Sequence, residues 1–324
     1  MRRERQRRKL TRGIPTAVIG CSIGPFSSGI PERRLLDKLR SYDFITVREQ
    51  YSADYLRQNR IACAYYPDIA FTLPDGWIPE ASGEACLGIS AYRREGMDNL
   101  PLYRAMSAAA DAFIRRTGNR VLLFALDLGR ENDLSAAYTI RSLSDFPEQM
   151  EIIPHDDCGG RVIAGLRRCG CLIAVRLHMA VMALRLGIPF VPVAYSQKTW
   201  NLLRDLNYPG EIFSVDSIAE KALDEAVRTA QTFPVSRDYL EAAQGHFGTF
   251  YCKRLWSVEM TPAAAFTFFF DPDILREVNP IVNAIKDTKT LQQAEEIIMK
   301  DFNLFPETRL PVNITAPIAP QIPD

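Results

Sequence analysis

The stretch Cys171–Lys198, CLIAVRLHMAVMALRLGIPFVPVAYSQK, indicates how this chain folds. It begins with an unbroken apolar run, Cys171–Val175, which is typical of a strand buried on both faces. The segment His178–Leu186 follows and predicts a helix that ends at Gly187, because glycine accommodates a left-handed C-cap. A second apolar run, Ile188–Val193, predicts the next strand. Strand, helix and strand joined by such short connections are typical of a parallel α/β sheet.

The same alternation continues on both sides of this stretch and divides into two series. The first, Thr16–Asp68, contains about three predicted strands, and the second, Cys86–Thr232, has enough strands for a complete doubly wound domain. Between them, Pro74–Glu84 contains Pro, Gly and Ser without a clear period, which predicts a linker. We therefore predict an α/β protein with a partial N-terminal Rossmann-like domain over residues 1–75, a C-terminal Rossmann-like domain over residues 84–233, and a helical extension with a proline-rich tail over residues 234–324.

Composition and charge exclude several classes of protein. Apolar residues make up 47% of the 324 residues, and 39 basic residues balance 39 acidic ones, so no net charge attracts nucleic acid. No apolar run approaches the roughly 20 residues of a membrane-spanning helix, and the basic start lacks the apolar core of a signal peptide. The seven cysteines form no CxxC pair, which argues against a zinc site and a disulfide framework. We therefore predict a cytoplasmic, metal-free protein.

Polar residues follow two of the predicted strands, at the edge of the sheet where open parallel sheets bind ligands. Arg176 and His178 lie where one strand gives way to a helix, whose N-terminus favours anions. The next strand brings Tyr195 and Lys198 to the same edge. These residues suit a phosphate or carboxylate ligand. They also fit a capping histidine and a surface ion pair, so the residues alone leave both interpretations open.

Four motifs stand out over roughly residues 14–225. They are Ile23-Gly24-Pro25-Phe26; Val47-Arg48-Glu49 with Ser52 and later Pro67-Asp68; Arg176-Leu177-His178 with Gly187-Ile188-Pro189, Tyr195 and Lys198; and, more weakly, Asp127 with Glu131-Asn132-Asp133. About twenty residues separate His178 from Lys198. In their order and spacing these motifs resemble those of the polysaccharide pyruvyl transferase family, in which the His and the Lys also lie about twenty residues apart.

The resemblance implies two Rossmann-like domains in the GT-B glycosyltransferase arrangement, with the active site in the cleft between them. It implies transfer of a pyruvyl group from phosphoenolpyruvate onto sugar hydroxyls, as a ketal, in cell-surface or exopolysaccharide biosynthesis. Arg48, His178 and Lys198 would be the catalytic residues, with His178 as general acid or phosphate ligand. The further substrate-binding residues would be Arg176, Ser52, Tyr195, Gly24 and Asp68. No cofactor is implied beyond phosphoenolpyruvate, which is the donor substrate.

The family also suggests what surrounds the reaction. The partners would be phosphoenolpyruvate and a saccharide acceptor. Because acceptors in this family can be lipid-linked, a peripheral location of the protein at the inner membrane face is also consistent with the resemblance. Members usually begin with further strands and helices, so we expect an N-terminally shortened relative whose first domain is incomplete. The sequence leaves open the acceptor sugar, the role of residues 257–324 and the oligomeric state.

Two other functions fit the same residues. A GT-B-like glycosyltransferase would use Arg176 and Lys198 to hold the diphosphate of a nucleotide sugar, with Glu220 or Asp224 on the sugar ring. A non-catalytic relative would bind only an anion or a partner protein. His155 and His246 are weaker candidates for a functional histidine than His178.

Overall fold

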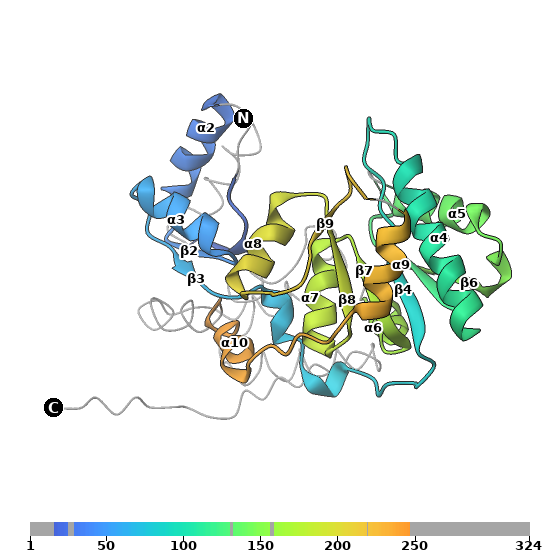
Figure 1. Ribbon diagram of the computed structural model, residues 1–324. Coiled ribbons are helices and arrows are strands. Elements are labelled where there is room, and N and C mark those ends of the chain that lie inside the picture. The colour runs from blue at the N-terminus through green and yellow to red at the C-terminus, as the bar shows by residue number, and fades with distance from the viewer. Residues whose placement is uncertain (1–15, 25–28, 130–131, 156–158, 219, 247–324) are drawn as a thin grey trace, which may run out of the picture. The chain divides into compact units, whose positions relative to one another are not determined.

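The computed structural model describes residues 16–24, 29–129, 132–155, 159–218 and 220–246 (Figure 1). The chain divides into two compact units, residues 1–250 and 251–324, and all described residues belong to the first. Of the predicted C-terminal extension, the structure therefore describes only the start, which includes α10 (Arg237–Ala242). None of the described helices has the length and apolar character needed to cross a membrane.

The first sheet is small and entirely parallel, with the strand order β1-β2-β3. Its strands are β1 (Ala17–Cys21), β2 (Phe44–Val47) and β3 (Ala64–Tyr65), and its helices are α2 (Gly29–Leu39) and α3 (Gln50–Gln58). Ile45 and Val47 of β2 pack with Leu56 of α3 in a hydrophobic core that is separate from the cores of the second sheet. A 3-10 turn, η1 (Ile69–Thr72), follows β3 after Asp68.

The second sheet has six parallel strands in the order β6-β5-β4-β7-β8-β9. The strands are β4 (Cys86–Ser90), β5 (Val121–Ala125), β6 (Met150–Pro154), β7 (Cys169–Ala174), β8 (Phe190–Ala194) and β9 (Phe213–Ser214). The order reverses between β4 and β7, which is the switch point of a doubly wound sheet, where ligands bind outside the carboxyl ends of the strands. The predicted α/β class with parallel sheets is confirmed.

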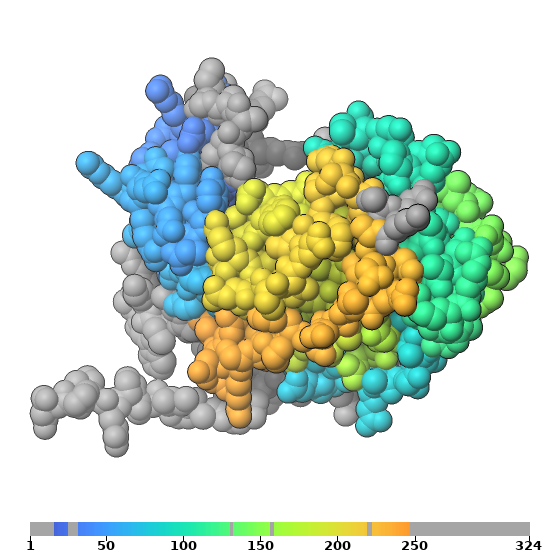
Figure 2. Space-filling model, in the orientation of Figure 1, coloured from blue at the N-terminus to red at the C-terminus, as the bar shows by residue number. Residues whose placement is uncertain are grey.

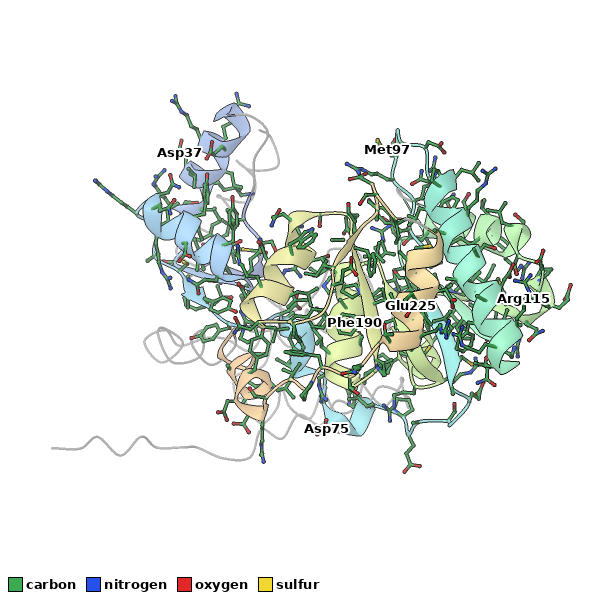
Figure 3. The ribbon with its side chains drawn as sticks, in the orientation of Figure 1. Asp37, Asp75, Met97, Arg115, Phe190 and Glu225 are labelled. Atoms are coloured by element: carbon green, nitrogen blue, oxygen red, sulfur yellow. The ribbon has the colours of Figure 1, made fainter. Side chains whose placement is uncertain are left out.

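Helices cover both faces of this sheet. They are α4 (Leu100–Thr117), α5 (Asp133–Leu143), α6 (Gly160–Leu166), α7 (Leu177–Leu186), α8 (Gln197–Asp205) and α9 (Glu220–Thr229). Successive strand residues point to opposite faces, so Leu123 packs with α4, α5 and α9 while its neighbour Leu122 packs with α6, α7 and α8. Phe190 of β8 lies in the interior, whereas Met97 and Arg115 lie at the periphery (Figure 3).

One helix boundary differs from the prediction in a way that affects the site. The sequence predicts a helix that starts at Trp200, whereas α8 starts at Gln197. The extended backbone of Ser196 forms the N-cap, so the helix begins almost directly after β8. Lys198 therefore lies in the first turn of α8, with its position fixed by the helix.

Gly88, in the middle of β4, has no room for a side chain. A Cβ atom there would lie 2.7 Å from Cδ1 of Leu172 and 2.9 Å from Sγ of Cys169. We expect Gly88→Ala to lower the free energy of unfolding by about 1–3 kcal/mol, because a filled core must shift. Urea unfolding measures the change. Gly76→Ala is the control, since nothing lies within 4 Å of its Cβ position, and equal effects of the two substitutions would refute the steric argument.

Candidate functional site

A pocket of about 390 Å³ lies at the carboxyl ends of strands from both sheets. This volume is within the usual range for a small-molecule site. The lining residues come from the ends of β2, β5, β7 and β8 and from the helices that follow β7 and β8. They are Arg48, Leu126, Asp127, Leu128, Arg176, Leu177, His178, Tyr195 and Lys198. The pocket thus brings together residues from most of the predicted motifs.

Arg48 follows β2 and reaches from the first sheet to the second. Its Nη1 donates to Oδ2 of Asp68 at 2.8 Å and lies 3.3 Å from Nε2 of His178, and its Nε donates to Oγ of Ser22 at 2.9 Å. Asp68 is only 2% exposed and is oriented by the backbone N–H of Ala70, from which it accepts a hydrogen bond. The described residues offer no partner to Nη2 of Arg48, so this nitrogen is available to a ligand.

His178 lies in the first turn of α7, where the backbone N–H groups have no partners within the helix. Arginine has no acceptor, so Nε2 of His178 must accept from Arg48, and the ring is neutral with its proton on Nδ1. The His178 residue is exposed. The pKa of His178 is nevertheless lowered, mainly because the surrounding atoms desolvate the ring. The negative charge of Asp68 raises this pKa, whereas the positive charges of Arg48 and Lys198 lower it further.

Lys198 supplies the free cation of the pocket. Its side chain is exposed, and it makes no ion pair with any residue in the described part of the chain. Asp127 also lines the pocket, and its Oδ1 accepts from the backbone N–H of Gly129 at 2.9 Å. The pocket therefore offers an unpaired ammonium group, an imidazole and a partly free guanidinium group beside one carboxylate.

Arg176 is held by a buried carboxylate. Its Nε donates to Oδ2 of Asp133 at 3.0 Å and its Nη2 donates to Oδ1 at 2.5 Å, while Asp133 is completely buried. The guanidinium carbon lies 4.8 Å from the ring centre of Tyr92 and 5.8 Å from that of Tyr195, and the two rings stack. Arg176 lines the pocket as predicted, but its forked donor face is occupied by Asp133.

Besides Asp68, which holds Arg48, two residues predicted to bind substrate, Ser52 and Gly24, are not among the lining residues. Ser52 is completely buried, where its Oγ accepts from the backbone N–H of Ile23 at 2.8 Å and donates to Oε1 of Glu49 at 2.9 Å. Gly24 has a φ of 77°, a left-handed conformation that suits glycine. Both residues shape the loop after β1, and the sequence does not separate this role from ligand binding.

His246 contacts Thr46 of β2 in the first sheet and is completely buried. Its Nε2 lies 2.8 Å from the carbonyl oxygen of Pro67, which can only accept, so Nε2 carries the proton. Its Nδ1 then accepts from Oγ1 of Thr46 at 2.7 Å. Burial lowers the pKa of His246, which keeps the ring neutral. It therefore supports the backbone next to Asp68.

The site residues that the sequence missed lack a local signal. Tyr92 follows β4, and a tyrosine after a strand carries no mark of its stacking partner. Asp133 belongs to the weakest of the four motifs, and its role depends on Arg176, which lies 43 residues away in the chain. Only the strand order places β5 and β7 on either side of β4.

Solved structures with a similar chain course include two glycosyltransferases and a wall teichoic acid polymerase. A glycosyltransferase from Rickettsia africae has 9% identity and a TM-score of 0.37, with 82% of this chain and 70% of that chain covered. A variant of the wall teichoic acid polymerase TagF has 11% identity and a TM-score of 0.36, with 83% and 65% covered. AviGT4, a glycosyltransferase involved in avilamycin A biosynthesis, has 15% identity and a TM-score of 0.32, with 68% and 74% covered. At these TM-scores the likeness carries no argument about function.

Comparison with curated proteins and with protein families gives a clearer result. No curated protein matches the chain. A family described as a protein of unknown function, DUF1152, matches residues 206–308. The family described as polysaccharide pyruvyl transferase matches residues 7–197, more than half of the chain, and this match ends one residue before Lys198. The chain belongs to the polysaccharide pyruvyl transferase family.

Proposed function

We propose that this protein transfers a pyruvyl group from phosphoenolpyruvate onto two hydroxyl groups of a saccharide. One observation carries the proposal: Arg48, His178 and Lys198 line one pocket. Arg48 comes from the first sheet, and 130 residues separate it from His178 in the chain. These are the three residues that the family resemblance assigns to the donor.

The pocket has the groups that a small trianion requires. Phosphoenolpyruvate carries a carboxylate and a phosphate, which are both anions. Two hydrogen-bond donors of the pocket, Nη2 of Arg48 and the ammonium group of Lys198, have no acceptor among the described residues and can bind these anions. The first turn of α7 adds the backbone N–H groups of Leu177 and His178, which have no acceptor within the helix and favour an anion. The buried Asp68 holds Arg48 in place and balances part of its charge.

The reaction can be written with every atom accounted for. A proton is added to the methylene carbon of phosphoenolpyruvate, which becomes a methyl group and leaves positive charge on the neighbouring carbon. Oxygen atoms of two saccharide hydroxyls form bonds to that carbon, the carbon–oxygen bond to phosphate breaks, and the two hydroxyl protons replace the one consumed and protonate the phosphate. We propose that His178 supplies the first proton or holds the phosphate.

The nucleotide-sugar alternative receives less support from the described side chains. Arg176, which would hold a diphosphate, is paired with Asp133. Asp224, which would bind the sugar ring, makes an ion pair with Arg116 at 2.9 Å and does not line the pocket. The side chain of Glu220 lies outside the described residues.

The proposed function is tested by calorimetric titration with phosphoenolpyruvate. We expect wild-type protein to bind and Lys198→Ala to bind about 10- to 100-fold more weakly, since a charge-assisted hydrogen bond contributes about 1.5–3 kcal/mol. Lys198 is exposed, so its removal should leave the fold intact. Lys38→Ala is the control, because Lys38 does not line the pocket. Folded wild-type protein that does not bind phosphoenolpyruvate but does bind a nucleotide sugar would refute the proposal.

Donor binding is expected to take up a proton at His178. The pKa of His178 is lowered in the free protein, and an anion beside the ring should raise it. Between these two pKa values the bound form holds more protons, so affinity should strengthen as the pH falls, by up to about tenfold per pH unit. Titrations in buffers with different ionisation enthalpies measure the uptake. Phosphoenolpyruvate itself also titrates, so His178→Gln is the reference, and an unchanged uptake in that variant would exclude His178 as its source.

A further inference from the structure

A buried hydrogen-bonded bridge joins α8 to the N-terminus of α3. Nδ2 of Asn201 donates to Oε2 of Glu49 at 2.9 Å, and Oε1 of Glu49 accepts from Ser52 at 2.9 Å. One turn along α8, Oδ2 of Asp205 accepts from the backbone N–H of Gln50 at 2.8 Å. Asn201 and Glu49 are 2% and 3% exposed. The surfaces of α3, in blue, and α8, in yellow, lie side by side (Figure 2).

The two ends of the bridge adjoin the two cations of the pocket. Glu49 directly follows Arg48, and Asn201 lies three residues after Lys198, on the same side of α8. A displacement of α8 against α3 would therefore change the distance between Arg48 and Lys198. The bridge spans 152 residues of sequence and connects the first sheet with the second.

The chemistry of the bridge favours a role in geometry over a role in stability. A buried carboxylate costs free energy that apolar packing would not cost, and its hydrogen bonds are satisfied in only one register. Burial raises the pKa of Asp205, so the carboxylate that contacts Gln50 also costs free energy to bury. Asp205 also caps the first N–H of α3, whose own N-cap residue, Glu49, makes no side-chain cap.

We propose that Glu49, Asn201 and Asp205 are positioning residues that set the distance between Arg48 and Lys198 and so determine the affinity for the donor. This inference rests on the proposed function, since it assigns the two cations to one ligand. A purely structural bridge would affect unfolding without affecting the affinity of the folded protein.

Exchange of the carboxylate and the amide across the bridge tests the inference. Asn201→Asp places two carboxylates face to face, which should separate α8 from α3 and weaken phosphoenolpyruvate binding by about tenfold or more. In the double variant Glu49→Gln and Asn201→Asp, the new amide at position 49 donates to the new carboxylate at position 201 and still accepts from Ser52. Affinity should return to within about threefold of wild type. Glu49→Gln alone should have an intermediate effect.

The measurements are the dissociation constant for phosphoenolpyruvate by calorimetry and the urea unfolding curve, on the full chain. Ile140→Ala is the matched control, since it opens a cavity in the core beneath α5 and should lower stability without altering affinity. Affinity that stays at the wild-type value in folded Asn201→Asp protein, or that the double variant fails to restore, would overturn the positioning role. Wild-type protein that does not bind phosphoenolpyruvate would overturn the proposed function and this inference together.

Discussion

Replacement of Arg48 by methionine is expected to abolish measurable binding of phosphoenolpyruvate and to lower the free energy of unfolding by about 3 kcal/mol. Two effects combine. The pocket loses the guanidinium group that reaches from the first sheet and donates hydrogen bonds. Asp68, which is 2% exposed, is left as an uncompensated charge. The estimate is at the lower end for a buried ion pair because the side chain of Arg48 is 16% exposed. Calorimetry and urea unfolding measure the two effects separately.

A second substitution separates stability from binding at this position. In the double variant Arg48→Met and Asp68→Asn, the new amide can still accept from the backbone N–H of Ala70, and no buried charge remains. We expect most of the stability to return and binding to remain absent. Binding by either variant at the wild-type affinity would show that Arg48 does not contact the donor.

Replacement of Arg176 by methionine is expected to have the largest effect on stability, about 3–5 kcal/mol. Asp133 is completely buried and also accepts from the backbone N–H of Asp127 at 2.9 Å, so it cannot turn to solvent when its partner is lost. The stacked rings of Tyr92 and Tyr195 lose the cation that lies against them as well. Urea unfolding at neutral pH measures the change.

The same variant distinguishes the two roles of Arg176. Because its forked face is turned to Asp133, we expect the folded Arg176→Met protein to lose less donor affinity than Arg48→Met loses. The double variant Arg176→Met and Asp133→Asn should recover part of the stability, since the buried charge is gone. Unchanged stability with complete loss of binding would instead show that Arg176 is a direct ligand of the donor.

The sequence was most informative where local periodicity and the ends of strands carried the signal. The predicted strands Cys171–Val175 and Ile188–Val193 lie within one or two residues of the bounds of β7 and β8, because each is an apolar run between clear breaks. His178 and Lys198 begin helices directly after the neighbouring strands β7 and β8, and parallel strands bring such positions to one edge of a sheet, whereas Arg48 follows β2 of the first sheet. The α/β class and the meeting of His178 and Lys198 at one sheet edge therefore followed from the chain alone, while the assignment of Arg48 to the same site came from the family resemblance.

What the sequence could not supply is the partner of each charged residue. Arg176 has the same sequence context whether it binds a ligand or pairs with Asp133, and only the strand order β5-β4-β7 brings these two side chains together. Ser52 and Glu49 likewise became parts of a buried bridge because α8 packs against α3. The amino-acid sequence by itself determined which residues stand at the ends of strands, because that depends on local periodicity. The tertiary structure alone decided which of them remain free for a ligand, because that depends on contacts between segments far apart in the chain.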